Sequence, residues 1–548
     1  MVVRLTRRTL LHRGALLTGG AAASAMLARC GGGQAQQGGA PPTSTSTTDA
    51  PISVTTPTAP VESPAQAVDA VRFAWWTDVG YPNPFQVSTT GPGGAVLLTL
   101  IYDTLTWKDE EGIIPWLAER WEATPDGTEY TFWLVSGATW HDGQPLTASD
   151  AVFSFQYYRD HPYRWMAIPM VASAEEGQDD GSLRMTLTQP YAAFLEEIAG
   201  IVPIVPRHVW ERVADPTTYE GEDRAIGSGP FTLAAYDSAA GAYRLKAIEG
   251  YWRGRPRVRE WQQFTVPAEA RVQVVQQGDA DLSLSTDASV ETLIADNSSL
   301  RVFATAPLSL VRLVCNTGRA PLDRREVRQA IAYALDRARI AETITRGPAI
   351  VGSAGVVPPE TPWFNPSLPQ YPYDPERART LLGGEQLTIE LIADTGAREP
   401  DLMAPMLAAV GITLDVKRVD APTRTQLLSE GSFQLALTSH IGVGGDPDYL
   451  RRWYAGEEAN AFAQGSIFRH DEYARLGEEA AATRDPERRR EIVFRMQEIL
   501  AEELPTIVLY HRRFYWVYDP RVFTPMETWG GLMNGIPFPN NKLTLIES

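Results

Sequence analysis

Few residues in this sequence combine the types and the spacing that catalysis requires. His141 and Asp142 are adjacent and could exchange a proton, but they precede Gly143 in a segment whose composition is typical of a turn. Acidic pairs such as Asp279 with Asp281 could serve as general acid and base, yet pairs of this kind are common on solvated faces. The sequence contains no HExxH, P-loop, CxxC or GxSxG motif. The chain is therefore predicted not to be an enzyme.

The residues that commonly bind metals are dispersed along the chain. The seven histidines do not recur at metal-ligand spacing, and the only cysteines are Cys30 and Cys315. Cys315 lies in an apolar run, which is typical of a small buried side chain, and no disulfide between the two cysteines is expected. We therefore predict neither a metal site nor a cofactor. The histidines are His12, His141, His161, His208, His440, His470 and His511.

The composition is that of a large acidic protein. With 548 residues the chain is longer than a single hydrophobic core usually supports, so two or more lobes are expected. Apolar residues make up 44% of the sequence, which is enough for a sizeable core. The formal net charge of -18 disfavours nucleic acid and anionic membrane surfaces as partners.

The first residues resemble an export signal. Residues 6–11, with Arg7 and Arg8, match a twin-arginine motif, and residues 14–28 form an uncharged, mainly apolar run that is too short to span a bilayer. We predict that residues 1–29 are a twin-arginine-type signal peptide. The protein is therefore expected at the outer face of the cell membrane or in the periplasm.

Cys30 occupies the position of the acylated cysteine of a bacterial lipoprotein. Glycine-rich sequence follows it, as a flexible tether requires, although Arg29 stands where that motif prefers a small residue. We predict that Cys30 is lipidated and anchors the protein to the membrane. The alternative is cleavage at the small residues 23–25, which would release a soluble protein. Residues 30–67 are predicted to be a disordered linker, because Gly, Gln, Ser, Thr and Pro dominate them.

In the remainder of the chain, strand-like and helix-like segments alternate, which indicates an α/β fold. Turn formers at 125–127 predict a hairpin whose second arm is the strand-like run 130–135. Thr147 and Asp150 resemble a capping box, so a helix should begin at Ala148.

Two further helices are predicted. Residues 324–343 carry an apolar stripe, Asp323 can cap their start and Gly347 marks their end. Asp485, followed by Pro486 in the first turn, starts the other helix. Both helices are expected to pack against the protein rather than to bind a ligand.

Several segments occur in an order that resembles a known family. Residues 117–155 are the most distinctive, and the segments together span nearly all of the chain after the linker. They resemble the family 5 extracellular solute-binding proteins, the receptors of ABC importers for dipeptides, oligopeptides, nickel complexes and some saccharides. The other segments are IGSGPF at 226–231, GYWRGRP at 250–256, residues 316–336, GDPD at 445–448 and residues 485–509.

The resemblance implies an α/β fold of the two-lobed periplasmic-binding-protein type II clamp, with an extra subdomain in the first lobe. The first lobe would comprise residues 68–307 and 511–548, and the second lobe residues 308–510. Two apolar runs, 308–315 and 507–510, lie where the chain would cross between the lobes.

The same resemblance implies a receptor without catalytic activity. It would capture a small solute, a peptide in the first place, between its lobes and deliver it to ABC permease subunits, and it would act as a monomer. The alternative from another functional class is a secreted hydrolase. The family places its cleft at positions that here are Trp76, Val79, Tyr81, Tyr102, Ser228, Gly229, His440, Val443 and Asp446.

One position departs from the family pattern. In peptide-binding relatives an aspartate shortly before the DPD-like sequence pairs with the α-ammonium of the ligand, and here Val443 takes that place. Unless Asp446 or Asp448 substitutes for it, the usual partner of a free amino terminus is missing. A saccharide or another neutral solute is therefore the alternative ligand class.

Overall fold

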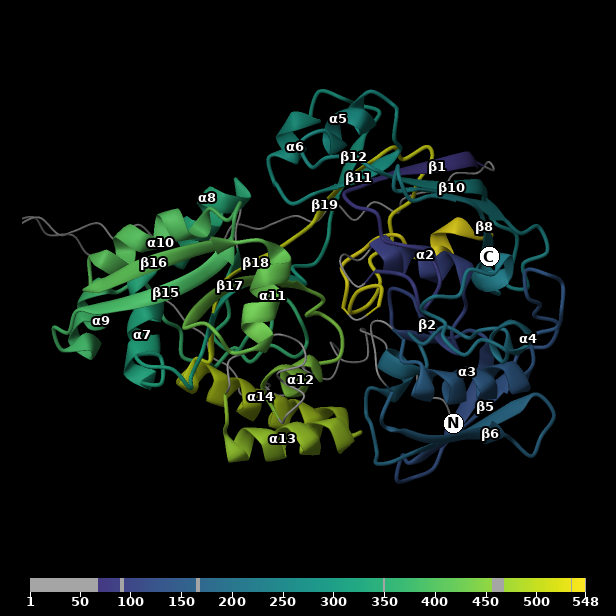
Figure 1. Cartoon of the computed structure of the whole chain (residues 1–548), viewed down its shortest axis with the longest axis horizontal. Coiled ribbons are helices and arrows are strands. Elements are labelled where there is room, and N and C mark those ends of the chain that lie inside the picture. Colours follow the sequence, from purple (N-terminus) through teal and green to yellow (C-terminus); the bar gives the residue numbers. More distant parts are fainter. Residues whose placement is uncertain are drawn as a thin grey trace, which may run out of the picture. The chain divides into compact units, whose positions relative to one another are not determined.

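The computed structural model describes residues 68–88, 93–163, 168–347, 350–455, 468–533 and 535–547. The predicted signal peptide, Cys30 and the predicted linker lie outside these residues. Within them, we find no helix that is both long enough and apolar enough to cross a membrane. Helices and strands alternate along the described chain, as the sequence predicts, and form an α/β fold (Figure 1).

The first sheet has seven strands in the order β12-β19-β11-β1-β10-β9-β8. Strand β1 (Val68–Trp75) runs parallel to both of its neighbours, β10 (Val258–Thr265) and β11 (Leu282–Ser285). The carboxyl ends of these three strands therefore point to the same edge of the sheet. The other strands, antiparallel to their neighbours, are β8 (Phe231–Asp237), β9 (Ala242–Ala247), β12 (Arg301–Ala304) and β19 (Tyr515–Tyr518).

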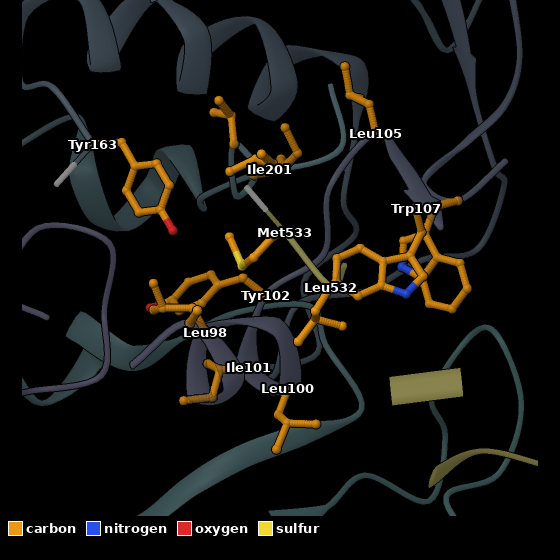
Figure 2. Close-up of a cluster of buried hydrophobic side chains, with 14 of the residues drawn as sticks. Leu98, Leu100, Ile101, Tyr102, Leu105, Trp107, Tyr163, Ile201, Leu532 and Met533 are labelled. Carbon is orange, nitrogen blue, oxygen red and sulfur yellow. The ribbon is translucent and has the colours of Figure 1, made fainter. Parts of the chain in front are cut away.

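The largest hydrophobic core contains α2 (Gly93–Ile101), which is mainly apolar and buried along its whole length. Figure 2 shows Leu98, Ile101 and Tyr102 close to Leu532 and Met533, near the other end of the described chain. Residues from both ends of the described chain thus share one core, and the C-terminal segment is part of the fold.

The second sheet has six strands in the order β14-β18-β13-β17-β15-β16. The two apolar runs predicted at the lobe crossings lie in β13 (Ser309–Cys315) and β18 (Thr506–Arg512), which are antiparallel neighbours. Cys315 is buried and unbonded, and burial raises the pKa of its thiol to about 12, as fits a packing residue. The other strands are β14 (Ile350–Val351), β15 (Leu387–Asp394), β16 (Ile412–Val419) and β17 (Leu435–Ile441).

A four-stranded sheet in the order β4-β5-β7-β6 contains the predicted hairpin. The arms are β4 (Ala118–Ala123) and β5 (Glu129–Leu134), which pair antiparallel. Helix α3 (Ala148–Asp160) begins where the capping box predicts, and the Asp150 carboxylate accepts the backbone N–H of Thr147 at 2.9 Å. The remaining strands are β6 (Val171–Glu176), β7 (Ser182–Leu187) and, in a two-stranded sheet, β2 (Thr106–Lys108) and β3 (Ile113–Pro115).

The prediction of one helix over residues 324–343 is wrong, because the chain forms two helices there. They are α7 (Arg325–Ala334) and α8 (Arg337–Thr345). Between them the chain is extended, and Asp336 caps α8 by accepting the backbone N–H of Arg339 at 3.0 Å. The apolar stripe continues through the break, so periodicity alone did not reveal this second cap.

The helix predicted at Asp485 is confirmed as α14 (Pro486–Glu503). The Asp485 carboxylate accepts the backbone N–H of Arg488 at 2.7 Å, and Pro486 occupies the first turn. The remaining α-helices are α4 (Arg207–Trp210), α5 (Arg271–Gln276), α6 (Val290–Leu293), α9 (Pro375–Leu382), α10 (Glu399–Ala408), α11 (Ala421–Ser429), α12 (Tyr449–Tyr454) and α13 (Asp471–Ala482).

Candidate functional site

The carboxyl edge of the first sheet is one candidate region. In open α/β sheets, ligands bind outside the carboxyl ends of the parallel strands. Trp76 directly follows β1, and Arg271 lies shortly after the end of β10. The pairing of Trp75 with Thr265 brings these two strand ends to the same level. Segments far apart in the sequence are thus brought together at a position suited to binding.

Trp76 is partly exposed at this edge. One face of its ring stacks on Trp75, with ring centroids 3.9 Å apart and an interplanar angle of 24°. The guanidinium carbon of Arg271 lies 5.2 Å from the centroid of the Trp76 ring. A half-buried tryptophan beside a cation offers an apolar surface and a positive charge within one small area.

Val79 and Tyr81 follow in the same loop but differ in accessibility. Val79 is fully buried, and its backbone N–H donates to the hydroxyl of Tyr243 at 2.9 Å. Tyr81 is half-buried, and the guanidinium carbon of Arg224 lies 3.9 Å from its ring centroid. Of these two predicted residues, Tyr81 alone has side-chain surface left for a ligand.

Tyr102, Ser228 and Gly229 lie together around the end of α2, inside the core. Tyr102 and Ser228 are each 1% exposed. The backbone N–H of Gly229 donates to the carbonyl of Ile101 at 2.9 Å, and a Cβ at Gly229 would lie 2.5 Å from the carbonyl oxygen of Leu100. Glycine is therefore required here by the close approach of two backbones, and all three residues contribute to packing.

A buried carboxylate explains why these segments meet. Asp103 is fully buried and accepts hydrogen bonds from Trp116 Nε1 at 2.7 Å and from the Lys542 ammonium at 2.6 Å. The hydroxyls of Ser228 and Tyr251 also donate to it, at 3.3 and 3.0 Å. The IGSGPF and GYWRGRP segments thus converge on one ion pair in the core.

His141 and Asp142 occupy the turn that the sequence predicts, and each has a structural partner. The Nε2 atom of His141 lies 3.0 Å from the carbonyl oxygen of Gly229, and burial lowers the pKa of this ring to about 4. The Asp142 carboxylate lies 2.8 Å from Nε2 of His208. These contacts tie the turn to neighbouring segments.

The end of β17 and the loop after it form the second candidate region. The ring of His440, the second-last residue of β17, lies T-shaped against Trp453, with centroids 4.4 Å apart. Burial and the nearby charges of Arg312 and Arg452 lower the pKa of His440 to about 3, so this ring is neutral at physiological pH. Val443 is 1% exposed and packs in a hydrophobic cluster. Its side chain therefore has no charge to offer a ligand.

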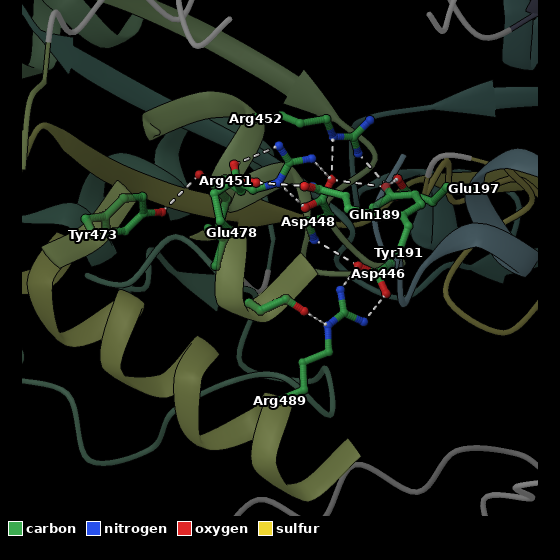
Figure 3. Close-up of polar contacts among 12 residues, drawn as sticks. Gln189, Tyr191, Glu197, Asp446, Asp448, Arg451, Arg452, Tyr473, Glu478 and Arg489 are labelled. Carbon is green, nitrogen blue, oxygen red and sulfur yellow. Dashed lines mark hydrogen bonds and ion pairs between the residues drawn. The ribbon is translucent and has the colours of Figure 1, made fainter. Parts of the chain in front are cut away.

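Both aspartates that could substitute at Val443 are already paired with arginines (Figure 3). The carboxylate of Asp446 accepts hydrogen bonds from both terminal nitrogens of Arg489, one of them at 2.6 Å. The carboxylate of Asp448 accepts hydrogen bonds from Arg451 at 2.7 and 2.9 Å. Both carboxylates are buried. An α-ammonium group could bind either one only by displacing an arginine.

This network continues into residues 191–197 (Figure 3). The hydroxyl of Tyr191 lies 2.8 Å from the Glu197 carboxylate and 3.1 Å from the Asp448 carboxylate. Arg452 donates to Glu197 at 3.1 Å. Burial and the neighbouring carboxylates raise the pKa of Glu197 to about 7, against the attraction of Arg452. Buried polar contacts thus join two segments that are far apart in the sequence.

The structure divides the predicted site residues into three groups. Trp76 and Tyr81 are accessible at or near the edge of the first sheet, whereas His440 lies near the end of β17, and Val443 and Asp446 belong to the loop after it. The remaining members are the buried residues Val79, Tyr102, Ser228 and Gly229. In the described part of the chain, we find no group of three or more His, Cys, Asp or Glu side chains that could hold a metal ion.

Arg271 is the residue at this edge that sequence reasoning missed. Its local sequence contains no motif, and its position depends on the parallel pairing of β10 with β1. A partial signal was present, because Arg271 follows a strand-like run shortly after Pro267. That signal identifies a loop, not its neighbours in space.

Known proteins are similar to this chain in sequence and in fold. The family model "Bacterial extracellular solute-binding proteins, family 5 Middle" matches residues 112–462. The dipeptide-binding protein of Escherichia coli (strain K12) is 26% identical over 444 residues, which cover 74% of this chain and 82% of that protein. Heme-binding protein A of Haemophilus influenzae is 28% identical over 451 residues, which cover 76% of this chain and 82% of that protein.

A solved structure shares the fold. It is an ABC transporter-associated periplasmic binding protein of Helicobacter pylori in complex with the peptide STSA. It matches with a TM-score of 0.72 at 20% sequence identity and covers 85% of this chain and 98% of its own. This likeness confirms the two-lobed α/β fold that the sequence predicts.

Proposed function

Because the chain belongs to the bacterial extracellular solute-binding proteins of family 5, we propose that it captures a solute outside the cytoplasm and delivers it to an ABC importer. The match to the family model over residues 112–462 is the observation that carries this conclusion. A peptide is the favoured ligand, since similar proteins include a dipeptide-binding protein and a binding protein in complex with a peptide. In this proposal the chain acts as a receptor and not as an enzyme.

We assign the two large sheets to the two lobes. The first lobe, residues 68–307 and 511–548, contains every strand of the seven-stranded sheet, and the second lobe, residues 308–510, contains nearly all of the six-stranded sheet. Where the chain crosses between lobes, the N–H of Thr305 donates to the carbonyl of Phe514 at 2.9 Å. The N–H of Phe514 donates to the hydroxyl of Thr305 at 3.0 Å. This pairing supports a hinge in which both crossings move together.

The network of Figure 3 supports a closed form of the receptor. In this assignment Tyr191 and Glu197 belong to the first lobe, and Asp448 and Arg452 belong to the second. The contacts of Tyr191 with Asp448 and of Arg452 with Glu197, both at 3.1 Å, therefore span the two lobes and require closure. A ligand that binds between the lobes favours the closed form, and this form presents the surface that the permease recognises.

The ligand in this proposal lies between the edge that carries Trp76 and Tyr81 and the segment formed by the end of β17, with His440, and the following loop, with Val443. A neutral solute such as a saccharide is the second candidate. A neutral solute is favoured by two ion pairs, Asp446 with Arg489 and Asp448 with Arg451, because neither carboxylate is then available to a ligand ammonium group. A peptide bound here would need another anchor than its amino terminus.

Export and anchoring complete the proposal. The sequence of residues 1–29 supports twin-arginine export, and the position of Cys30 supports a lipid anchor followed by a flexible linker over residues 30–67. The receptor would act as a monomer beside the permease subunits. Its net charge of -18 fits a protein that meets the membrane through a lipid and not through a basic surface.

Ligand binding to the purified protein tests the proposal. We would screen dipeptides, oligopeptides, oligosaccharides and nickel chelates by thermal shift, because a ligand of the native state raises the melting temperature. A hit should change tryptophan fluorescence saturably at one ligand per chain, with no product detectable by mass spectrometry. Hydrolysis of a bound peptide or glycoside would contradict the receptor assignment. Binding of an oligosaccharide without any peptide would select the second candidate.

A further inference from the structure

We infer that Arg271 and Trp76 form a subsite for a carboxylate group of the solute, at the carboxyl edge of the first sheet. The inference rests on the proposed function and adds to it the chemical class of group that the solute carries. It also gives a bound peptide an anchor at its carboxyl end in place of the missing one at its amino end.

Arg271 differs from the other buried arginines of the described residues. Its side chain is largely enclosed, with the residue 8% exposed, and its buried Nε and Nη1 atoms have no hydrogen-bond partner. Each of the other four donates hydrogen bonds to protein acceptors. The four are Arg312, which donates to Tyr454, Arg328, which donates to Glu503, Arg337, which donates to backbone carbonyls, and Arg489, which donates to Asp446.

A buried guanidinium without an anion lowers stability unless a ligand supplies the anion. Burial lowers the pKa of Arg271, but an arginine remains charged at neutral pH. The carboxylate that acts on it most strongly is Glu269, which is exposed and makes no ion pair with Arg271 among the described contacts. The contact with the Trp76 ring compensates only part of the desolvation cost.

The surroundings of Arg271 favour an organic carboxylate over an inorganic anion. Trp76 is partly exposed beside the guanidinium, so an apolar part of the solute can lie on this ring while its carboxylate meets the charge. A planar guanidinium donates in a fork that matches two carboxylate oxygens. Both residues stand at the carboxyl edge of parallel strands, where binding is expected on grounds independent of charge.

A comparison of two methionine variants tests the inference without any solute. Arg271→Met should leave the melting temperature of the unliganded protein unchanged or raise it by about 1–3 °C, because it removes an unpaired buried charge. Arg328→Met is the matched control, since Arg328 donates to the backbone carbonyls of Leu322 and Glu503 and to the Glu503 carboxylate, and its loss should lower the melting temperature. If Arg271→Met lowers the melting temperature as much as Arg328→Met does, or prevents folding, Arg271 is structural and the inference is wrong.

Benzoate and benzamide serve as probes with and without the negative charge. At millimolar concentrations and constant ionic strength, benzoate should raise the melting temperature of the wild type, and benzamide should not. Arg271→Met should abolish the benzoate shift. An equal shift in the wild type and the variant, or no shift in the wild type, would overturn the inference.

These outcomes are separable from a failure of the proposed function. If the peptide and saccharide screen fails while the benzoate shift depends on Arg271, the anion subsite stands and the solute assignment fails. If peptides bind but their affinity does not depend on Arg271, the receptor stands and the subsite fails.

Discussion

The segment after β10 and the segment after β17 both bury arginine charge, but only the second neutralises it. Around β17, Asp446 pairs with Arg489, Asp448 pairs with Arg451, and Glu197 contacts Arg452. After β10, Arg271 is enclosed beside Trp76 and has no anion. The charges of the second region therefore stabilise contacts within the protein, and the charge of the first remains available to a ligand.

This difference separates residues that hold the structure from residues that can recognise a solute. A buried ion pair whose members satisfy each other adds little to ligand binding, because a ligand must first displace one member. An unpaired buried charge can add to ligand binding, since a ligand of the opposite sign compensates the cost of its desolvation. Substitutions can separate the two kinds of residue through their effects on stability and on solute affinity.

The largest loss of stability should come from breaking the buried ion pair between Asp446 and Arg489. Arg489→Ala removes the two hydrogen bonds and the charge that Arg489 supplies to the buried Asp446 carboxylate, and it should lower the free energy of unfolding by about 3–5 kcal/mol. Urea unfolding would measure this loss. Arg488→Ala is the control on the same helix, because Arg488 makes exposed ion pairs with Glu479 and Glu491.

If the two arginine variants lose the same stability, the ion pair of Asp446 is not the reason for the loss. That result would also remove the argument that Asp446 is unavailable to a ligand.

A smaller effect should appear in the pH dependence of stability. The pKa of Glu197 is raised from 4.5 to about 7, so the folded state holds a proton that the unfolded state has released. The stabilisation from Glu197 is therefore complete below about pH 4.5 and is lost as the pH rises through about 7. The surrounding charged and titratable groups are Glu196, Tyr191, Asp446, Asp448 and Arg452.

Glu197→Gln mimics the protonated carboxyl and should flatten the fall in stability between pH 5 and pH 7.5. Urea unfolding at several pH values would measure the slope. The comparison must be between variant and wild type, because His440, with a pKa of about 3, acts in the opposite direction: its contribution to stability is lost as the pH falls below about 6.5. Parallel slopes for the two proteins would contradict the assignment to Glu197.

The smallest effect should come from a predicted site residue that the structure places in the core. Ser228→Ala removes a hydroxyl that donates to Asp103 at 3.3 Å, so it should cost about 1 kcal/mol of stability. Solute affinity should not change, because Ser228 is 1% exposed. Calorimetric titration of wild type and variant with a solute from the screen would check this. A tenfold loss of affinity at unchanged stability would show that Ser228 belongs to the binding site.

Local signals in the sequence predicted much of the fold. The capping residues Thr147 and Asp485 gave correct helix starts, because a cap depends on a few neighbouring residues. The break between α7 and α8 was missed, since the apolar stripe continues across Asp336 and packing decides where the helix ends. The motifs between residues 117 and 509 identified the fold and the family, which the family model confirms.

The candidate site was harder to predict from the sequence than the fold, because its chemistry depends on contacts between residues that are far apart in the sequence. Ser228 is polar and lies in a family landmark, yet its hydroxyl meets Asp103, 125 positions away. Asp446 has a partner 43 positions away, and no local pattern shows that its charge is already neutralised. Arg271 could be recognised only by the absence of such a partner, which a sequence does not reveal.

Calorimetric titration with one peptide from the screen, in three chemical forms, distinguishes an anchor at the carboxyl terminus from one at the amino terminus. The forms are the free peptide, its N-acetyl derivative and its C-terminal amide. We expect acetylation to change the affinity by less than about twofold, whereas amidation should weaken it by about tenfold or more and Arg271→Met should remove this difference. A large loss on acetylation with no loss on amidation would show that the amino terminus is the anchor and that Arg271 does not bind the carboxylate of the peptide.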